Sequence, residues 1–190
     1  MAHPSSVLSF LFISQLVMAI ANASLYCPTP CESQLTMELY LHDIHPPQPN
    51  HNLVVSVPFN EPGYHGFGSI TVNDWALLDA PSPTAKLIGN AKGTGVNTDP
   101  VNGFIYQNSF SILFRDGSFT GSTLQVMGLN IVGEWAIVGG TGQLAFARGT
   151  IKYETVLNVP NVEYYLKLNI RALYSPQSFS MNDPGSFWWL

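Results

Sequence analysis

The sequence has few charged residues, and they are unevenly divided between the two signs. Charged residues make up 10% of the chain, with 7 Lys and Arg against 12 Asp and Glu, which gives a formal net charge of -5. This balance leaves no basic surface for nucleic acid or for an acidic membrane face. Because 46% of the residues are hydrophobic, the chain must bury a core, which excludes a disordered, solvated tail.

Long hydrophobic runs are also missing, apart from one near the N-terminus. Residues 7–20 read VLSFLFISQLVMAI and are followed by Ala21, Asn22 and Ala23. This run is shorter than the roughly 20 residues that span a bilayer, which argues against a membrane anchor. Small residues at alternate positions are what signal peptidase accepts. The sequence therefore predicts a cleaved signal peptide over residues 1–23, a secreted protein and no membrane partner.

Cysteine is scarce, and no group of residues has the spacing of a metal site. Cys27 and Cys31 are the two cysteines of the chain, and in an oxidising compartment they form a local disulfide or remain free thiols. A closed zinc site takes four Cys or His ligands, which this pair does not supply. The histidines at 42, 45 and 51 span a Pro-rich segment without helical spacing. We expect no metal site, and solvent-exposed loop histidines.

What the sequence does contain is a regular series of short strand-like segments. They alternate in character and are separated by turn residues among the 16 Gly and 14 Pro of the chain. We predict an all-β fold, a barrel or a sandwich, in one domain over residues 36–174. Residues 24–35 and 175–190 would be tails. The predicted strands cover residues 36–44, 53–57, 67–74, 85–93, 104–114, 122–128, 134–139, 144–156 and 162–174.

Common catalytic motifs are absent, but two ionisable residues stand out. Asp43 shares a predicted strand face with Leu41, and Arg148 has the same parity as Leu144 and Phe146. If these faces point into a barrel, both charges lie in an apolar lumen, where burial is unfavourable unless they pair or meet a ligand. A buried acid there would have a raised pKa and could transfer protons. The alternatives are a structural ion pair or a strand-end Asp that faces solvent.

Several motifs together resemble those of plant dirigent proteins. They are LHDI (41–44), FGSITVND (67–74), SPTAKLIGNAKG (82–93), GSFTGSTLQVMG (117–128), IVGGTG (137–142) with ARG (147–149), and VEYYLKLNI (162–170). The resemblance implies a secreted eight-stranded antiparallel β-barrel with an apolar pocket, assembled as a homo-oligomer, either a dimer or a trimer. It implies no cofactor, since members capture monolignol phenoxy radicals made by an external laccase or peroxidase. They direct stereoselective coupling in lignan or lignin biosynthesis in the apoplast.

The same resemblance implies the residues of the site. Asp43 and Arg148 match the pocket Asp and Arg of the family and would be the catalytic residues. The expected substrate contacts are Leu41, Gly95, Gln143 and Phe146. Many members have Asp where this chain has Gln143, and an amide cannot act as an acid; many have Tyr where this chain has Gly95.

The resemblance also bears on the cysteines. Members commonly join an N-terminal Cys to a Cys near the last strand, and residues 172–176 contain none. We therefore expect Cys27 to pair with Cys31.

Two other functions fit the same residues. The protein could be a lyase or cyclase that acts on a phenolic or isoflavonoid-type substrate through a quinone methide, which turnover without an added oxidase would reveal. Alternatively, it could be a non-catalytic cell-wall or defence scaffold that uses the apolar tail at Trp188 and Trp189.

Overall fold

The computed structural model describes residues 32–56 and 66–175, and this part of the chain is built almost entirely of strands. A single turn of 3-10 helix, η1 (Gly142–Leu144), is the exception to the strands and loops. No helix in the described residues is long and apolar enough to cross a membrane. The strands are β1 (Ser33–Ile44), β2 (Leu53–Ser56), β3 (Ile70–Leu78), β4 (Leu87–Asn97), β5 (Tyr106–Phe114), β6 (Thr123–Leu129), β7 (Glu134–Thr141), β8 (Arg148–Val159) and β9 (Glu163–Tyr174).

The strands lie close to the nine predicted segments, with two informative differences. β1 begins at Ser33, inside the segment that was expected to be a tail, because residues 33–35 pair with the end of β9. β8 begins at Arg148 and not at residue 144. The residues before it form η1 and a turn in which Phe146 has φ +59, a left-handed conformation that a strand does not contain.

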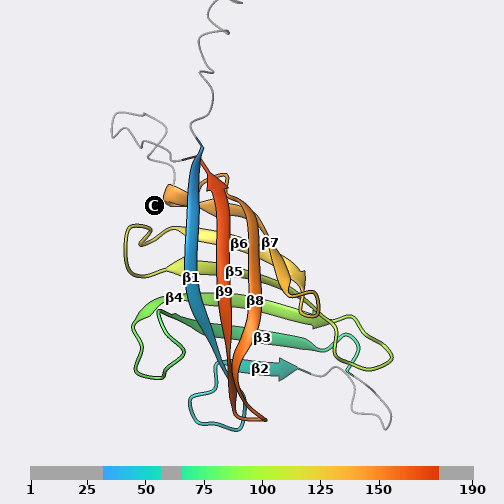
Figure 1. The fold of residues 1–190 in the computed structure, drawn as a ribbon. Helices are drawn as coiled ribbons and strands as arrows, with labels where there is room; N and C mark the ends of the chain where they lie inside the picture. Colours follow the sequence, from blue (N-terminus) through green and yellow to red (C-terminus); the bar gives the residue numbers. More distant parts are fainter. Residues whose placement is uncertain (1–31, 57–65, 176–190) are drawn as a thin grey trace, which may run out of the picture. The chain divides into compact units, whose positions relative to one another are not determined.

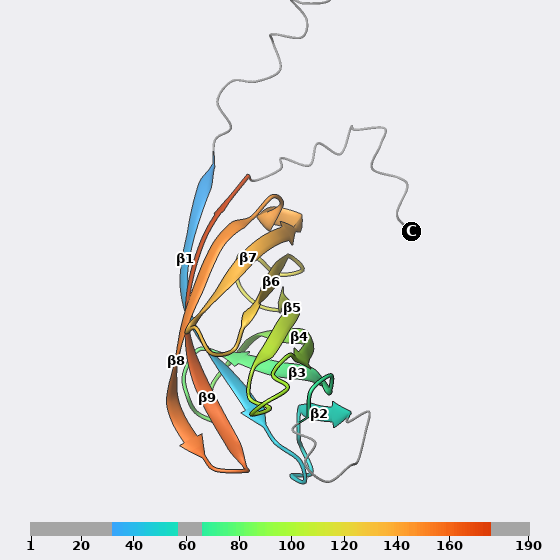
Figure 2. The same cartoon turned by 90° about the vertical axis from the view of Figure 1, so that its right-hand side faces the viewer.

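The strands form one antiparallel sheet that closes on itself. The order is β1-β9-β8-β7-β6-β5-β4-β3-β2, and β1 also pairs with β3 through residues 40–42 and 76–78. β2 pairs with the other half of β3 and therefore lies outside the closed ring of eight strands. In Figure 1, β1, β8 and β9 run across the direction of β3 to β6, and Figure 2 shows the two groups side-on. The predicted eight-stranded antiparallel barrel is confirmed.

Alternation of side chains along each strand fills the barrel interior. On β1, the buried residues Leu35, Leu39 and Leu41 all lie on the same face of the strand, as expected for a strand with one face on the core. They belong to one core cluster with apolar residues of other strands, among them Ile112 of β5 and Leu168 of β9. This apolar packing occupies one end of the interior, and the functional cavity lies at the other.

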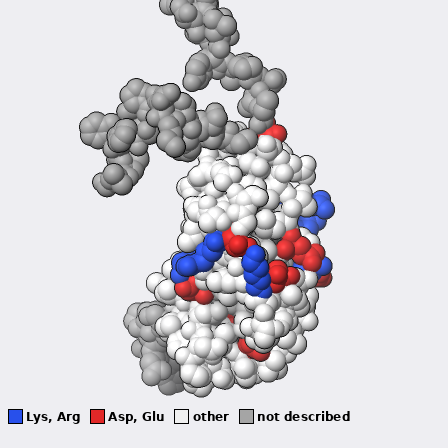
Figure 3. Space-filling model, turned by 90° about the vertical axis from the view of Figure 1, so that its left-hand side faces the viewer, with Lys and Arg blue, Asp and Glu red and all other residues white. Residues whose placement is uncertain are grey.

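Charged side chains lie mainly on the outer surface, where several form pairs. Lys86 pairs with Asp116, Lys92 with Asp74, and Lys167 with Glu38. Figure 3 shows one face of the molecule, on which the charged side chains gather in a band with uncharged surface on both sides. Such exposed pairs contribute little to stability.

Three sequence predictions fall outside the described residues. These are the signal peptide over residues 1–23, the pairing of Cys27 with Cys31, and the C-terminal tail beyond Ser175. The structure therefore does not test them.

Candidate functional site

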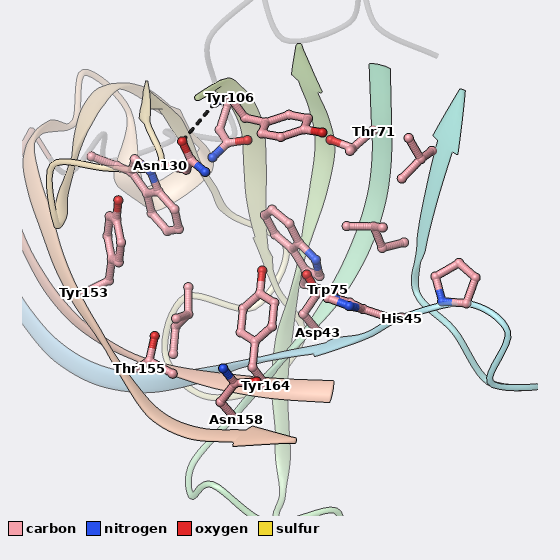
Figure 4. A pocket seen from close by; sticks show the side chains of 16 residues that line it. Asp43, His45, Thr71, Trp75, Tyr106, Asn130, Tyr153, Thr155, Asn158 and Tyr164 are labelled. Carbon is pink, nitrogen blue, oxygen red and sulfur yellow. Dashed lines mark hydrogen bonds and ion pairs between the residues drawn. The ribbon is translucent and has the colours of Figure 1, made fainter. Parts of the chain in front are cut away.

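A cavity of about 700 Å³ opens at the end of the barrel away from the apolar packing. This volume is within the range of small-molecule sites. Figure 4 shows the lining side chains converging on it from strands on opposite sides of the barrel. They are Asp43, His45, Pro46, Leu53, Val55, Thr71, Trp75, Tyr106, Asn108, Asn130, Trp135, Tyr153, Thr155, Asn158, Tyr164 and Leu166.

A row of aromatic rings separates the cavity from the packed end. Phe110 meets Trp75 edge-on at 5.7 Å and Trp135 edge-on at 5.1 Å between ring centroids. Trp135 in turn stacks on Tyr153 at 4.1 Å. Edge-to-face and offset-stacked contacts of this kind are the favourable arrangements of aromatic pairs. The cavity therefore has a rigid aromatic floor suited to the faces of an aromatic ligand.

Small residues on β4 leave room for these rings and for the cavity wall. A Cβ atom on Gly93 would lie 2.5 Å from the Cβ of Phe110, so Phe110 needs glycine at that position. A Cβ on Gly95 would lie 2.6 Å from both Thr71 Oγ1 and Asn108 Oδ1. The Thr71 hydroxyl donates to the Gly95 carbonyl at 3.2 Å and accepts from the Gly95 amide at 3.1 Å.

Asp43 is the carboxyl group of the cavity lining. Its side chain is fully buried, and neither carboxyl oxygen has a hydrogen-bond partner among the described residues. Burial raises the pKa of Asp43 above its ordinary value, and the nearby Tyr164 hydroxyl, His45 and Trp75 indole partly oppose that rise. A buried polar group without a partner is uncommon in native proteins and calls for an explanation.

Other polar groups of the cavity are also available to a ligand. The indole Nε1 atoms of Trp75 and Trp135 are buried without a hydrogen-bond acceptor among the described residues. Burial, and then the charge of Asp43, raise the pKa of Tyr164 well above its ordinary value. The Tyr164 phenol therefore stays protonated and serves as a hydrogen-bond donor. The chemistry available in the cavity is thus one carboxyl group that can exchange a proton and several N–H and O–H donors that can bind oxygen atoms of a ligand.

His45 lies beside the carboxyl. Its Nε2 is 3.7 Å from Asp43 Oδ1, and its ring meets Tyr164 edge-on at 5.4 Å. The expectation of solvent-exposed loop histidines is wrong for His42, which is 7% exposed within β1. His45 follows that strand, is partly exposed and lines the cavity. His42, on the opposite face of β1, stacks on Tyr165 and pairs with Glu163 at 2.6 Å.

The expected lumen position of Arg148 is wrong. Its guanidinium lies outside the cavity in a two-point ion pair with Glu32, with Nη2 2.8 Å from Oε2, and its side chain is 59% exposed. The physical reason is the phase of β8. Ile151 is fully buried, and because alternate residues face opposite sides, Arg148 and Lys152 face outward.

None of the four expected substrate contacts is part of the cavity lining. Leu41 is fully buried in the core, one inward-facing position before Asp43. Gly95 lies behind the wall formed by Thr71. The Gln143 amide donates to the Ser118 carbonyl at 2.8 Å on the exposed surface, and Phe146 is 67% exposed.

Sequence reasoning missed most of the lining residues. Tyr164 alternates with the inward-facing Leu166 and Leu168 in a strand that was predicted, so its parity was available as a signal. Tyr106 and Asn130 come from loop-proximal positions, where the Tyr106 amide donates to Asn130 Oδ1 at 2.9 Å. No local sequence signal brings these two residues to the cavity.

Comparison with known proteins agrees with this architecture. The family model described as "Dirigent-like protein" matches residues 34–173. Dirigent protein 11 of Arabidopsis thaliana is 30% identical over 139 residues, which are 70% of this chain and 71% of the relative. Pterocarpan synthase 1 of Glycyrrhiza echinata is 30% identical over 164 residues, which are 78% of this chain and 86% of the relative.

A solved structure resembles the fold as well. The pterocarpan synthase dirigent protein GePTS1 superposes with a TM-score of 0.69 at 25% identity and covers 78% of this chain and 94% of its own. The matched region includes all nine strands apart from the first residue of β1 and the last of β9. The chain therefore belongs to the dirigent family.

Proposed function

We propose that this protein binds a phenolic intermediate in its cavity and directs the closure of a ring from one face through a quinone methide. The observation that carries the proposal is the Asp43 carboxyl, which is buried in the wall of a cavity with an aromatic floor and has no hydrogen-bond partner among the described residues. A carboxyl whose pKa is raised by burial can hold a proton and deliver it to a substrate. Similarity to proteins named pterocarpan synthases supports a ring-forming reaction.

The proposed reaction involves no net oxidation. Asp43 protonates a benzylic hydroxyl of the substrate, the C–O bond breaks and water leaves, while the phenol releases its proton to solvent. A second hydroxyl of the same molecule adds to the benzylic carbon of the quinone methide and gives up its proton to a base. The ring oxygen and the Asp43 carboxylate each regain a proton, which balances the two protons released, so the net change is loss of water.

Stereochemistry would follow from orientation in the cavity. Trp135 stacks on Tyr153 at one side of the site, and Figure 4 shows Asp43, Trp75 and Tyr164 together at another. A ligand held between them presents one face to its nucleophile. A difference of about 1.4 kcal/mol between the two approaches already gives tenfold selectivity.

Radical coupling is the second candidate function, and the size of the cavity supports it. A volume of about 700 Å³ can hold two phenolic rings, as the pairing of two monolignol phenoxy radicals requires. In that reaction an external laccase or peroxidase would make the radicals, and the protein would orient them. The similarity to proteins named dirigent proteins supports this candidate.

One assay separates the two functions. The protein is added either to a phenol that carries a benzylic alcohol and an internal hydroxyl, without oxidant, or to coniferyl alcohol with laccase, and the products are resolved by chiral chromatography. Enantiomeric excess in the first reaction supports ring closure; excess only in the second supports radical coupling. Racemic products in both would exclude both functions for these substrates.

Variants locate the activity in the cavity. Asp43→Asn keeps the shape of the side chain but removes the acid, and we expect about a 100-fold lower ring-closing rate. Arg148→Ala is the matched control, since its side chain lies outside the cavity, and it should leave the product ratio unchanged. Equal activity of Asp43→Asn and the unmodified protein would overturn the assignment of Asp43 as the acid.

Export to the apoplast is part of the proposed function. The apolar run over residues 7–20 and Ala21 to Ala23 support it. N-terminal sequencing of protein from the medium of plant cells should begin at Ser24. Retention of Met1 in an intracellular product would contradict export.

Assembly with further copies of the chain is also proposed. Cross-strand register places Val54, Val72, Thr94, Ser109 and Met127 in one outward row without charge. Val54, Val72 and Met127 are 52%, 54% and 43% exposed, and such apolar surface is typical of contact sites. Light scattering should give a dimer or trimer mass, which Val72→Lys lowers and the loop control Val101→Lys does not. A monomer at all concentrations would exclude assembly.

A further inference from the structure

His45 occupies a position that connects the buried carboxyl to solvent. Asp43 lies near the end of β1 and His45 follows that strand directly, and both side chains line the cavity. The Asp43 side chain is fully buried, whereas that of His45 is 34% exposed, and Nε2 of the ring lies 3.7 Å from Oδ1 of the carboxyl. His45 is thus both a neighbour of the acid and in contact with water.

The chain holds His45 in this position from several sides. Its backbone amide donates to the Val162 carbonyl at 2.8 Å, and its own carbonyl accepts from the Gln48 amide at 3.2 Å. The ring packs edge-on against Tyr164. These contacts leave the imidazole aimed at the cavity, which it lines together with Asp43 and Trp75.

The groups that face His45 are few. Asp43 from β1 and the Tyr164 phenol from β9 are its titratable neighbours among the described cavity residues, and Trp75 of β3 adds an indole N–H near the carboxyl. His42 acts differently, because it lies on the other face of β1 and is paired with Glu163. Only one of the two imidazoles flanking Asp43 in the sequence HDIH therefore reaches the cavity.

From this geometry we propose that His45 is the base that accepts the proton of the adding hydroxyl and passes it to Asp43. The inference rests on the proposed ring closure. When water leaves, Asp43 has lost its proton and is a carboxylate. The adding hydroxyl gives its proton to the neutral imidazole, the new C–O bond forms, and the imidazolium returns that proton from Nε2 to Oδ1. Both side chains then regain their starting states.

The separation of 3.7 Å is compatible with this transfer. Hydrogen bonds between catalytic groups are often long in the absence of substrate and tighten when it binds, or they act through one water molecule. An imidazole is suited to the task because its ring nitrogens can both accept and donate a proton. A carboxyl and an imidazole in one cavity thus divide the acid and base roles that a single carboxyl would otherwise perform in turn.

The kinetic test uses the phenol with a benzylic alcohol and an internal hydroxyl, without oxidant. We expect His45→Gln to lower kcat/KM about 100-fold and to remove one limb of its pH profile. Added imidazole should restore His45→Ala but not Asp43→Asn. The double variant Asp43→Asn/His45→Gln should be no slower than the slower single variant, because paired groups are not additive. His51→Ala, an exposed histidine of the same segment, is the matched control.

The outcomes separate the two proposals. If Asp43→Asn is slow while His45→Gln keeps the rate and pH profile of the unmodified protein, the role of His45 is overturned and the role of Asp43 stands. If Asp43→Asn is as fast as the unmodified protein, Asp43 is not the acid, and the proton return to it fails as well.

A second measurement needs no substrate. The ¹³C resonance of the Asp43 carboxyl, followed by NMR against pH, should move in two steps, and the step due to the imidazole should vanish in His45→Gln. A single, unchanged step in both proteins would show that the two groups do not share a proton equilibrium. That result overturns the proposal whatever the substrate.

Discussion

The two ends of the barrel interior are made by the same strands but are filled differently. β1 passes from Leu39, at 3% exposure, to Asp43, and β9 passes in the opposite direction from Tyr164 to the fully buried Leu168. One end is a close-packed apolar core, and the other is a cavity in which several buried polar groups have no hydrogen-bond partner in the described part of the chain. The difference indicates that the packed end carries the stability, which leaves the open end free to hold reactive groups.

The largest expected effect lies at the packed end. Leu168→Ala removes a fully buried side chain and should lower the free energy of unfolding by about 3 kcal/mol. Urea denaturation measures the loss. Leu157→Ala, on the outer surface at 43% exposure, should change the free energy by less than about 0.5 kcal/mol. Equal losses in the two variants would remove the distinction between core and surface on these strands.

The boundary between the two ends is sensitive to added volume. Gly93→Ala places a Cβ 2.2 Å from the Ser109 carbonyl oxygen and 2.5 Å from the Phe110 Cβ. We expect the free energy of unfolding to fall by about 2 kcal/mol, since the sheet and the aromatic floor must shift. Gly139→Ala is the control, because its Cβ would meet Gln125 at an ordinary 3.7 Å. Thermal unfolding of both proteins decides whether Phe110 depends on Gly93.

Hydrogen bonds at the cavity rim should contribute less. The Tyr153 hydroxyl donates to the Leu129 carbonyl at 3.2 Å and accepts from the Gly133 amide at 3.3 Å. Tyr153→Phe should therefore lower the free energy of unfolding by about 1 kcal/mol. Tyr106→Phe, whose hydroxyl makes no hydrogen bond with the other residues drawn in Figure 4, should lower the free energy of unfolding by less. The opposite order would mean that the rim is held by Tyr106.

The effect of Asp43 on stability depends on pH and has the opposite sign, because the substitution should stabilise the protein as the pH rises. Its folded-state pKa is raised above 3.8, so the folded state binds more protons than the unfolded state between the two pKa values. Stability from this group is full below about pH 3.8 and decreases as pH rises through the folded pKa. As the pH rises over that range, the melting temperature of Asp43→Asn should increase relative to that of the unmodified protein. A constant difference at all pH values would contradict the raised pKa.

The fold was predictable because each strand carries its own signal. Alternation and turn residues located all nine strands, and they placed Asp43 on the inward face together with Leu41. The same reasoning failed for Arg148, because it extended one alternating strand back through residues 144–147. There the chain turns through η1 and Phe146 with φ +59, which resets the phase of β8. Parity arguments hold only within an unbroken strand.

The candidate site was predictable only in its acid. His45 was assigned to an exposed loop, since a Pro-rich segment gives no sign of where its first residue points. Tyr106 and Asn130 both line the cavity, and a hydrogen bond joins these two residues from segments that are distant in sequence. Such positions depend on which strands become neighbours and in which register.

The sequence by itself determined the all-β class, the approximate strand positions and the placement of Asp43 on the same strand face as Leu41, because these depend on local alternation and turn chemistry. The tertiary structure decided how the barrel closes, through the short pairing of β1 with β3. It also decided that Arg148 pairs with Glu32 outside the cavity and that Asp43 meets His45, Trp75 and Tyr164 inside it. The physical reason is that strand pairing and closure are long-range choices, made by the packing of the whole interior and not by any one segment.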